Sequence, residues 1–291
     1  MCAPLDLGLL VAWDKSQPPL ALPDHPDARL LPLARAARQE AEAVEAALTS
    51  PPAAVTGLKA QPSRGPYAVL TWITGPVHTL DFRVYRSQQA DFAPAADNLV
   101  ATTNEEHWTD LQLAPTADYY YRVVATNGLG QTGAPSAEVK ITTGPLSKAR
   151  GCHYTKSLPP YPGYPDSGEA LATDGVYAGP YADRKSYGYR LAELGDAVQV
   201  AVTVDLGREE AIGRATHHNC GASGYRPDTM AVSVSRDGQT FTKVGDTDAV
   251  ARDLMSVDFP ETAARFVRFD FIKRRQGSSD DWLFLDELEV F

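Results

Sequence analysis

The sequence predicts an all-β protein made of two consecutive sandwiches, preceded by a short helical segment. Residues 53–145 and 150–291 consist of short blocks in which apolar and polar residues alternate, which is the period of half-buried strands. Gly, Pro and Asp-Gly turn signals separate these blocks. Each region is long enough to bury a core of its own, so we expect two domains and a shorter leading segment.

Composition limits the classes of partner. The chain of 291 residues is 43% hydrophobic and 22% charged, as in soluble globular proteins. Its apolar runs are all shorter than the roughly 18 residues that a membrane span needs, so we expect no membrane span. A net charge of -10 argues against nucleic acid, because a protein that binds the phosphate backbone needs a basic face.

Residues 1–50 hold a proline-rich stretch and then one amphipathic helix. Its apolar residues recur every three or four positions, at Leu33, Ala34, Ala37, Ala41, Val44 and Leu48. Fifty residues cannot supply a core, so we expect the last helix of a larger, missing N-terminal catalytic domain. The alternatives are that the helix docks on the next domain or that it self-associates. The apolar stretch Leu7–Trp13 has no basic residues before it and makes a poor signal peptide, which favours a fragment.

Residues 53–145 carry the marks of a sandwich of short strands. Trp72 is the expected core aromatic of an early strand that lies between Pro66 and Gly75. Leu113, Pro115 and Tyr119 lead into a later strand, and this pattern resembles the tyrosine-corner region of fibronectin type III domains. The resemblance implies a spacer without chemistry of its own. The expected strands cover residues 68–73, 81–87, 121–127 and 137–142.

Residues 150–291 show a different order of motifs. The turn Ala172–Gly175, the strand Val202–Gly207, the turn Ser235–Gly238 and the ending Trp282–Phe291 follow one another. This order resembles the carbohydrate-binding branch of the discoidin-like family, also called coagulation factor 5/8 type C or galactose-binding-like. The resemblance implies a jelly-roll sandwich with ligand loops at one end. We expect strands over residues 198–206, 212–217, 230–235, 241–244, 256–259, 264–272 and 283–291.

The resemblance also implies a structural calcium ion. It places the ion between the early Asp-Gly loop and the last strand, on Asp174 and Glu287. The nearby Asp183, which the resemblance does not place, is a candidate for a further oxygen donor. Val176 and Tyr177 stand where the family has small polar ligands. The alternative is that Asp174 is a turn residue and Glu287 a solvated or paired side chain.

Sugar recognition needs aromatic faces for the C–H surface of a ring and polar groups for its hydroxyls. The resemblance implies sugar contacts from His217, His218, Asn219, Tyr225 and Arg226, and other loops add Arg184, Tyr187 and Trp282. The alternatives are that the paired histidines pack or lie on the surface and that Trp282 belongs to the core. Adjacent strand residues point to opposite faces, which disfavours a metal site on the two histidines.

The preferred interpretation is a noncatalytic region that binds a glycan or polysaccharide, within a secreted glycan-active enzyme. We therefore predict that the chain is not itself an enzyme, because the paired carboxylates of a glycoside hydrolase do not stand out in it. One alternative is part of an intact glycoside hydrolase. The other is an adhesion protein that binds proteins or membrane surfaces, although basic residues are few apart from Lys273–Arg275.

Overall fold

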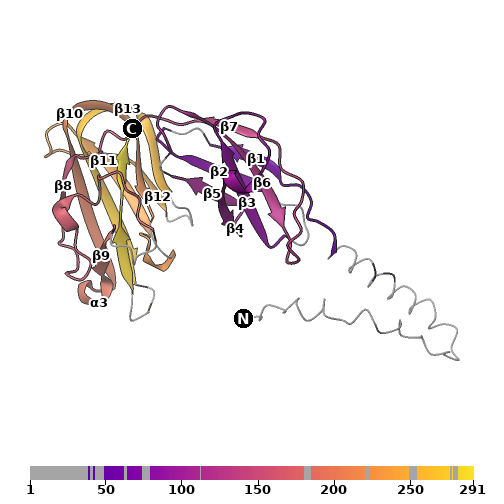
Figure 1. The fold of residues 1–291 in the computed structure, drawn as a ribbon. Coiled ribbons are helices and arrows are strands. Elements are labelled where there is room, and N and C mark those ends of the chain that lie inside the picture. Colours follow the sequence, from indigo (N-terminus) through magenta and orange to yellow (C-terminus); the bar gives the residue numbers. More distant parts are fainter. Residues whose placement is uncertain are drawn as a thin grey trace. The chain divides into compact units, whose positions relative to one another are not determined.

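Figure 1 shows the protein as a computed structural model. The structure describes residues 39, 42, 49–61, 64–73, 79–111, 113–179, 185–219, 223–248, 254–275, 277 and 281–291. The chain divides into two compact units, Met1–Ser50 and Pro51–Phe291. In the first unit only residues 39, 42, 49 and 50 are described, and the first three of these are helical. The rest of the predicted helix lies outside the described residues.

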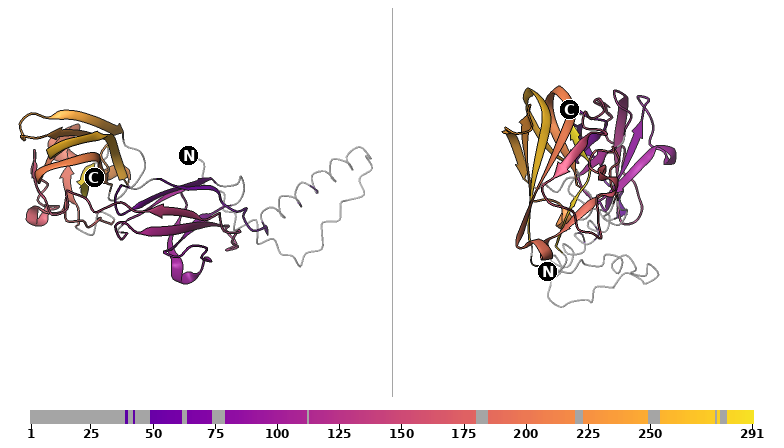
Figure 2. Two further views of the ribbon diagram at one scale, coloured as in Figure 1. Left: turned by 90° about the horizontal axis from the view of Figure 1, so that it is seen from above. Right: turned by 90° about the vertical axis from the view of Figure 1, so that its left-hand side faces the viewer.

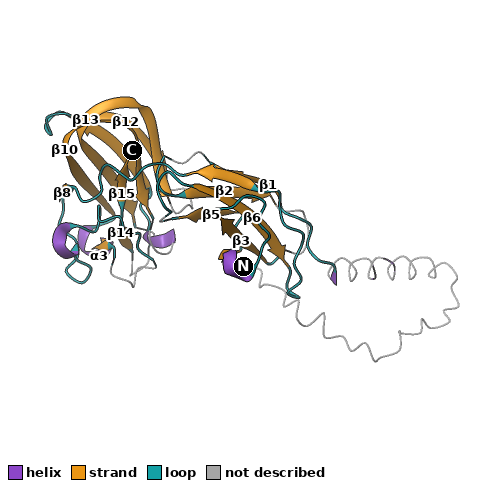
Figure 3. Cartoon of the chain, turned by 45° about the horizontal axis from the view of Figure 1, so that its top comes forward, coloured by secondary structure: helices purple, strands orange, loops and turns teal. Residues whose placement is uncertain are grey.

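Strands make up most of the regular structure that is described, as the sequence predicts (Figure 3). The short helical elements are η1 (Ala96–Asn98), η2 (Ser167–Glu169), α3 (Leu191–Leu194) and η4 (Ser223–Tyr225). The first sandwich pairs a three-stranded sheet, β1-β2-β5, with a four-stranded sheet, β4-β3-β6-β7. Its strands are β1 (Thr56–Ala60), β2 (Ala68–Ile73), β3 (Asp81–Ser87), β4 (Leu99–Thr103), β5 (His107–Asp110), β6 (Asp118–Thr126) and β7 (Val139–Thr142).

The core of the first sandwich joins its two sheets. Trp72 of β2 meets Phe82 of β3 edge to face, with ring centroids 5.4 Å apart, so the predicted core tryptophan is confirmed. Ahead of β6, the Ala114 amide donates a hydrogen bond to the Tyr119 hydroxyl at 3.0 Å. These contacts fix the turn into β6 against the core.

The second sandwich is organised around two long strands, β10 (Ala197–His218) and β13 (Leu254–Arg274), which run antiparallel and side by side (Figure 2). The sheet order is β12-β11-β13-β10-β15, and β8 also pairs with β10. Strands β9 and β14 form a separate pair. The remaining bounds are β8 (His153–Lys156), β9 (Tyr187–Arg190), β11 (Thr229–Ser235), β12 (Thr242–Asp248), β14 (Trp282–Leu285) and β15 (Leu288–Val290).

Three predicted boundaries in this region are corrected. The strands expected at 198–206 and 212–217 are one strand, β10, and those expected at 256–259 and 264–272 are one strand, β13. Their pairing continues through irregularities between Asp205 and Glu210 and between Ile212 and Arg214, where bulges absorb the break in alternation. The strand expected at 283–291 is instead split into β14 and β15 at residues 286–287.

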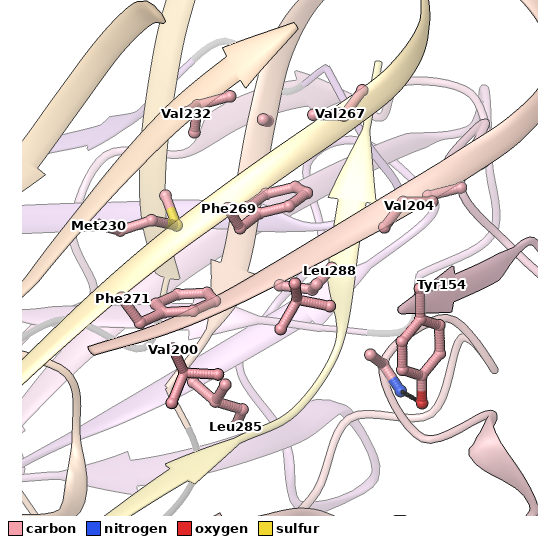
Figure 4. Close-up of a cluster of buried hydrophobic side chains, with 14 of the residues drawn as sticks. Tyr154, Val200, Val204, Met230, Val232, Val267, Phe269, Phe271, Leu285 and Leu288 are labelled. Atoms are coloured by element: carbon pink, nitrogen blue, oxygen red, sulfur yellow. Dashed lines mark hydrogen bonds between the residues drawn. The ribbon is translucent and has the colours of Figure 1, made fainter. Parts of the chain in front are cut away.

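Alternation along the long strands builds the second core (Figure 4). Phe269 and Phe271 of β13 are fully buried, with ring planes 8° apart, and Met230 of β11 is buried beside them in the same cluster. Each such side chain contributes about 1.5–3 kcal/mol through burial. Leu285 and Leu288 bring the last two strands into this core. The loops around β9 and β14 are thereby held on a rigid support.

Candidate functional site

Aromatic side chains gather around the β9–β14 pair. We call Tyr161, Tyr164, Tyr225, Trp282 and Phe284 the aromatic cluster. Trp282 and Phe284 lie two residues apart on β14 and therefore project from the same face. Their rings stack with centroids 5.6 Å apart and planes 23° apart. Trp282 remains half-buried, whereas Phe284 is buried beneath its neighbours.

The loop before β9 is tied to this pair through its backbone. The Tyr161 amide donates to the Gly188 carbonyl at 2.7 Å, and the Gly188 amide donates to the Tyr164 carbonyl at 3.0 Å. A Cβ atom at position 188 would lie 2.7 Å from Phe284 Cε1 in the buried ring, so glycine is required there. Both tyrosine rings meet Trp282 edge to face at 5.2 Å. The cluster is thus preorganised.

Arg190 adds a cation to the aromatic cluster. It pairs with Trp282 across the two strands, and its guanidinium lies 5.8 Å from the Trp282 ring centroid and 6.0 Å from that of Tyr161. Its Nε is buried and has no hydrogen-bond partner among the described residues. The side chain is 36% exposed, and its nearest acidic partner, Glu193, is 3.6 Å away. The surface therefore combines half-buried rings with a partly exposed arginine side chain.

His217 and Asn219 do not lie on this surface. His217 is fully buried, its ring lies 4.8 Å from that of Phe271, and its Nε2 faces the Asp286 amide at 3.4 Å. Burial lowers the pKa of His217 to about 3. Asn219 is also buried. Both side chains are therefore closed to a ligand in this structure, which gives no support to their predicted sugar contacts.

His218 is buried as well, and it holds a loop in place. Its Nδ1 lies 2.6 Å from an Asp286 oxygen that also accepts the Ala178 amide at 2.7 Å. The Tyr177 ring meets the imidazole edge to face at 5.0 Å. Burial raises the pKa of the Asp286 carboxyl. His218 therefore supports the segment around Tyr177 and Ala178 and has no free face for a ligand.

The remaining predicted residues divide into three groups. Tyr187 is fully buried beside Tyr189 and belongs to the core, which corrects its predicted place in a ligand loop. Asp183 and Arg184 lie outside the described residues. The rings of Tyr225 and Trp282 both contact the Phe284 ring. Arg226 follows Tyr225 and is half-buried.

Sequence reasoning missed three residues of the surface, Tyr161, Tyr164 and Arg190, and also the buried Phe284 that they surround. The run Tyr161–Tyr164, two tyrosines around Pro-Gly, was the available signal, because such a turn presents aromatic rings close together. Arg190 had no comparable signal. Its place depends on the cross-strand register of β9 with β14, which joins residues far apart in the sequence.

Asp174 and Glu287 do meet at the Asp-Gly loop. The Gly175 amide donates to Glu287 Oε2 at 3.0 Å, and the Val176 amide donates to Asp174 Oδ1 at 2.8 Å. Burial and the nearby acids raise the pKa of Glu287 to about 9, against the Gly175 hydrogen bond. The described residues contain no group of three acidic, histidine or cysteine side chains that could hold a metal. Asp183, the third predicted oxygen donor, lies outside the described residues, so calcium at this loop stays a prediction.

Comparisons with known proteins address the second sandwich. Residues 184–269 match the family model described as NedA-like, galactose-binding domain, of the F5/F8 type C group. The match supports the predicted discoidin-like, galactose-binding-like assignment of this sandwich. No curated protein matches the chain. Within the described residues, no helix is both long enough and apolar enough to cross a membrane.

Three similar solved structures are modules that bind sugars. A Clostridium perfringens module in complex with GalNAc-β-1,3-galactose is 20% identical, with a TM-score of 0.38, over 47% of this chain and 93% of its own. A Streptococcus pneumoniae fucose binding module is 19% identical, with a TM-score of 0.39, over 50% and 94%. A chitosan-binding module from Paenibacillus sp. IK-5 is 20% identical, with a TM-score of 0.38, over 50% and 98%.

Proposed function

We propose that the second sandwich is a noncatalytic glycan-binding module and that the aromatic cluster with Arg190 is its binding surface. The match of residues 184–269 to a galactose-binding family model carries this proposal. The position of the cluster supports it, because Trp282 is half-buried on a strand pair whose other face packs into the core. A rigid, partly exposed ring next to a guanidinium suits a sugar better than an apolar ligand.

The chemistry of binding follows from these residues. The exposed parts of Trp282 and Tyr161 offer ring surface to the C–H groups of a sugar. Arg190 donates hydrogen bonds to sugar hydroxyls, and its cation–π contacts keep the guanidinium in place. Little ordering is needed on binding because backbone hydrogen bonds already fix the loop. A shallow site of this kind binds with affinities of about micromolar to millimolar, or about 4–8 kcal/mol.

The wider context belongs to the same proposal. The first sandwich is a fibronectin type III spacer, a role supported by its seven-stranded arrangement and its Tyr119 hydrogen bond. The two sandwiches together are an accessory region of a secreted glycan-active enzyme whose catalytic domain precedes them. Avidity from that context would offset weak binding by one module.

The membrane-surface alternative has less support in the structure. Lys273 is 1% exposed and pairs with Asp228 at 3.1 Å. Arg275 lies 3.8 Å from Asp281. The basic run at Lys273–Arg275 is therefore partly engaged within the protein and does not form an open basic patch for anionic lipids.

A glycan array with the full chain tests the proposal. We expect selective binding to a small set of glycans, lost on Trp282→Ala and reduced at least tenfold on Arg190→Ala. Tyr120→Ala, which removes a half-buried tyrosine of the first sandwich, is the matched control and should bind as the natural chain does. Unchanged thermal unfolding of each variant shows that the fold is intact. A blank array with folded protein contradicts glycan binding, and retained binding in Trp282→Ala contradicts the assigned surface.

A further inference from the structure

An apolar cluster joins the two sandwiches, and we call its buried members Tyr67, Leu254 and Phe291 the junction cluster. Tyr67 of the first sandwich and Phe291 of the second meet edge to face, with ring centroids 6.1 Å apart and planes 67° apart. Val69 and Leu111 of the first sandwich pack against the cluster. Apolar surface that both sandwiches bury together favours the docked arrangement over separated domains.

A glycine of the first sandwich leaves room for the Phe291 ring. A Cβ atom at Gly65 would lie 2.3 Å from Phe291 Cζ and 2.8 Å from its Cε1, so a larger residue would push the ring away. The backbone of Phe291 is held by β10 of the second sandwich. Its amide donates to the Arg214 carbonyl at 2.9 Å, and its carbonyl accepts the Gly213 amide at 2.7 Å. One residue is therefore fixed on the second sandwich and packs on the first.

Polar contacts beside the cluster also cross between the sandwiches. Arg214 of β10 donates two hydrogen bonds to Asp258 of β13, both 2.7 Å long, which fix the direction of its guanidinium. From that position its Nη1 donates to the Tyr67 hydroxyl at 3.2 Å. Arg64 of the first sandwich approaches the same carboxylate, with its Nε 3.8 Å from Asp258 Oδ1. Because hydrogen bonds depend on angle as well as distance, these contacts select one relative orientation.

The connection between the sandwiches is short and attached at both ends. The Gly144 amide donates to the Gly65 carbonyl at 2.8 Å, which holds one end on the first sandwich. The Ser147 hydroxyl accepts the Val290 amide at 3.0 Å, which holds the other end on the second sandwich. Only residues 145–146 lie between these attachments. A connection of this length allows far fewer relative orientations than a flexible linker does.

We propose that the two sandwiches form one rigid body, held together by the packing of Phe291 on Tyr67 and Gly65, and that the first sandwich thereby sets the direction in which the second one faces. Figure 1 shows the chain end C and α3 at opposite ends of the second sandwich, and α3 directly follows Arg190 beside the aromatic cluster. The junction cluster therefore lies away from the glycan surface. The fixed direction of that surface rests on the proposed function, whereas the rigid junction does not.

Residual dipolar couplings of the weakly aligned full chain test the proposal. Couplings from the two sandwiches of the natural chain should fit one alignment tensor, because a rigid body has a single orientation. Gly65→Ala places a methyl group against the Phe291 ring, and Phe291→Ala removes the ring, so in each variant the two sandwiches should need separate tensors. Gly128→Ala is the matched control and should keep one tensor. That glycine also belongs to the first sandwich, and an added Cβ atom there meets no described residue within 4 Å apart from its chain neighbours.

Two results would overturn the proposal. The first is a natural chain whose sandwiches need different tensors, because that shows independent motion. The second is a single tensor kept by Gly65→Ala or by Phe291→Ala, because that shows that the ring contact does not hold the sandwiches together. If neither variant folds, the tensors of the natural chain decide. A blank glycan array together with one tensor in the natural chain contradicts the proposed function and leaves the rigid junction standing.

Discussion

Acid sensitivity of the second sandwich should depend strongly on one buried imidazole. His217 is fully buried, with its ring against Phe271 and its Nε2 facing the Asp286 amide. His217→Gln replaces it by a neutral side chain of similar reach that can still accept a hydrogen bond. The substitution therefore removes a titrating group from the core and leaves a polar acceptor in its place.

The size and sign of the effect follow from the pKa. Burial, with the neighbouring charge of His218, lowers the pKa of His217 to about 3 in the folded protein, whereas a histidine in an unfolded chain titrates near about 6.5. Between these values the unfolded state binds a proton that the folded state does not, so the free energy of unfolding falls as the pH falls. The free energy of unfolding falls by about 1.4 kcal/mol per pH unit between the two pKa values, or by about 5 kcal/mol in total. Above the unfolded-state pKa, His217 makes no difference to the free energy of unfolding as the pH changes.

Urea unfolding at a series of pH values measures this dependence. From about pH 6.5 to about pH 4, the natural chain should lose about 3 kcal/mol more than His217→Gln. His153→Gln, at an exposed histidine of β8, is the control and should follow the natural chain. Parallel curves for the natural chain and His217→Gln would refute the reasoning, because they would mean that the imidazole is protonated equally in both states.

Three further substitutions test contacts that define the fold. Gly175→Ala should destabilise more than Gly151→Ala, because both glycines have positive φ and alanine costs about 1–2 kcal/mol there, but only Gly175 underlies Arg150. Tyr119→Phe should lower the free energy of unfolding by about 1 kcal/mol through loss of one hydrogen bond. Asp110→Ala should cost about 1–3 kcal/mol, because it leaves the Tyr121 hydroxyl buried without its acceptor.

Urea unfolding at neutral pH also measures these effects, each with its own control. In an Arg150→Ala background, Gly175→Ala should lower the free energy of unfolding by no more than Gly151→Ala does. A larger effect of Gly175→Ala in that background would contradict the packing of the guanidinium on the glycine. Tyr120→Phe is the control for Tyr119→Phe, and equal effects of the two would remove the special role of the corner. Asp118→Ala, at an exposed position, is the control for Asp110→Ala and should cost much less.

Local sequence signals predicted many of the elements. The bounds of β2 and β3 agree with the predicted 68–73 and 81–87, because alternation and the flanking Pro and Gly residues act over only a few positions. Trp72 was placed in the core for the same reason. The short strands β5 and β9 were missed, since four residues are too few to show a period.

The site was harder to predict because its geometry is not local. His217 and His218 end a strand that reads as leading into a loop, but the Phe271 ring lies against His217, the Tyr177 ring lies against His218, and both side chains are buried. Where the last strand is split, the Asp286 carboxyl accepts a hydrogen bond from the Ala178 amide, more than a hundred residues away in the sequence. Long-range pairing of this kind leaves no pattern in the sequence around either residue.

A crystal structure of the full chain with the strongest ligand from the glycan array tests the central claim most directly. The account predicts a sugar ring against Trp282 and Tyr161, with Arg190 donating to its hydroxyls and Phe284 beneath. His217 and Asn219 should remain buried and without contact to the sugar. A glycan bound at another surface, with the aromatic cluster free of ligand, would contradict the account.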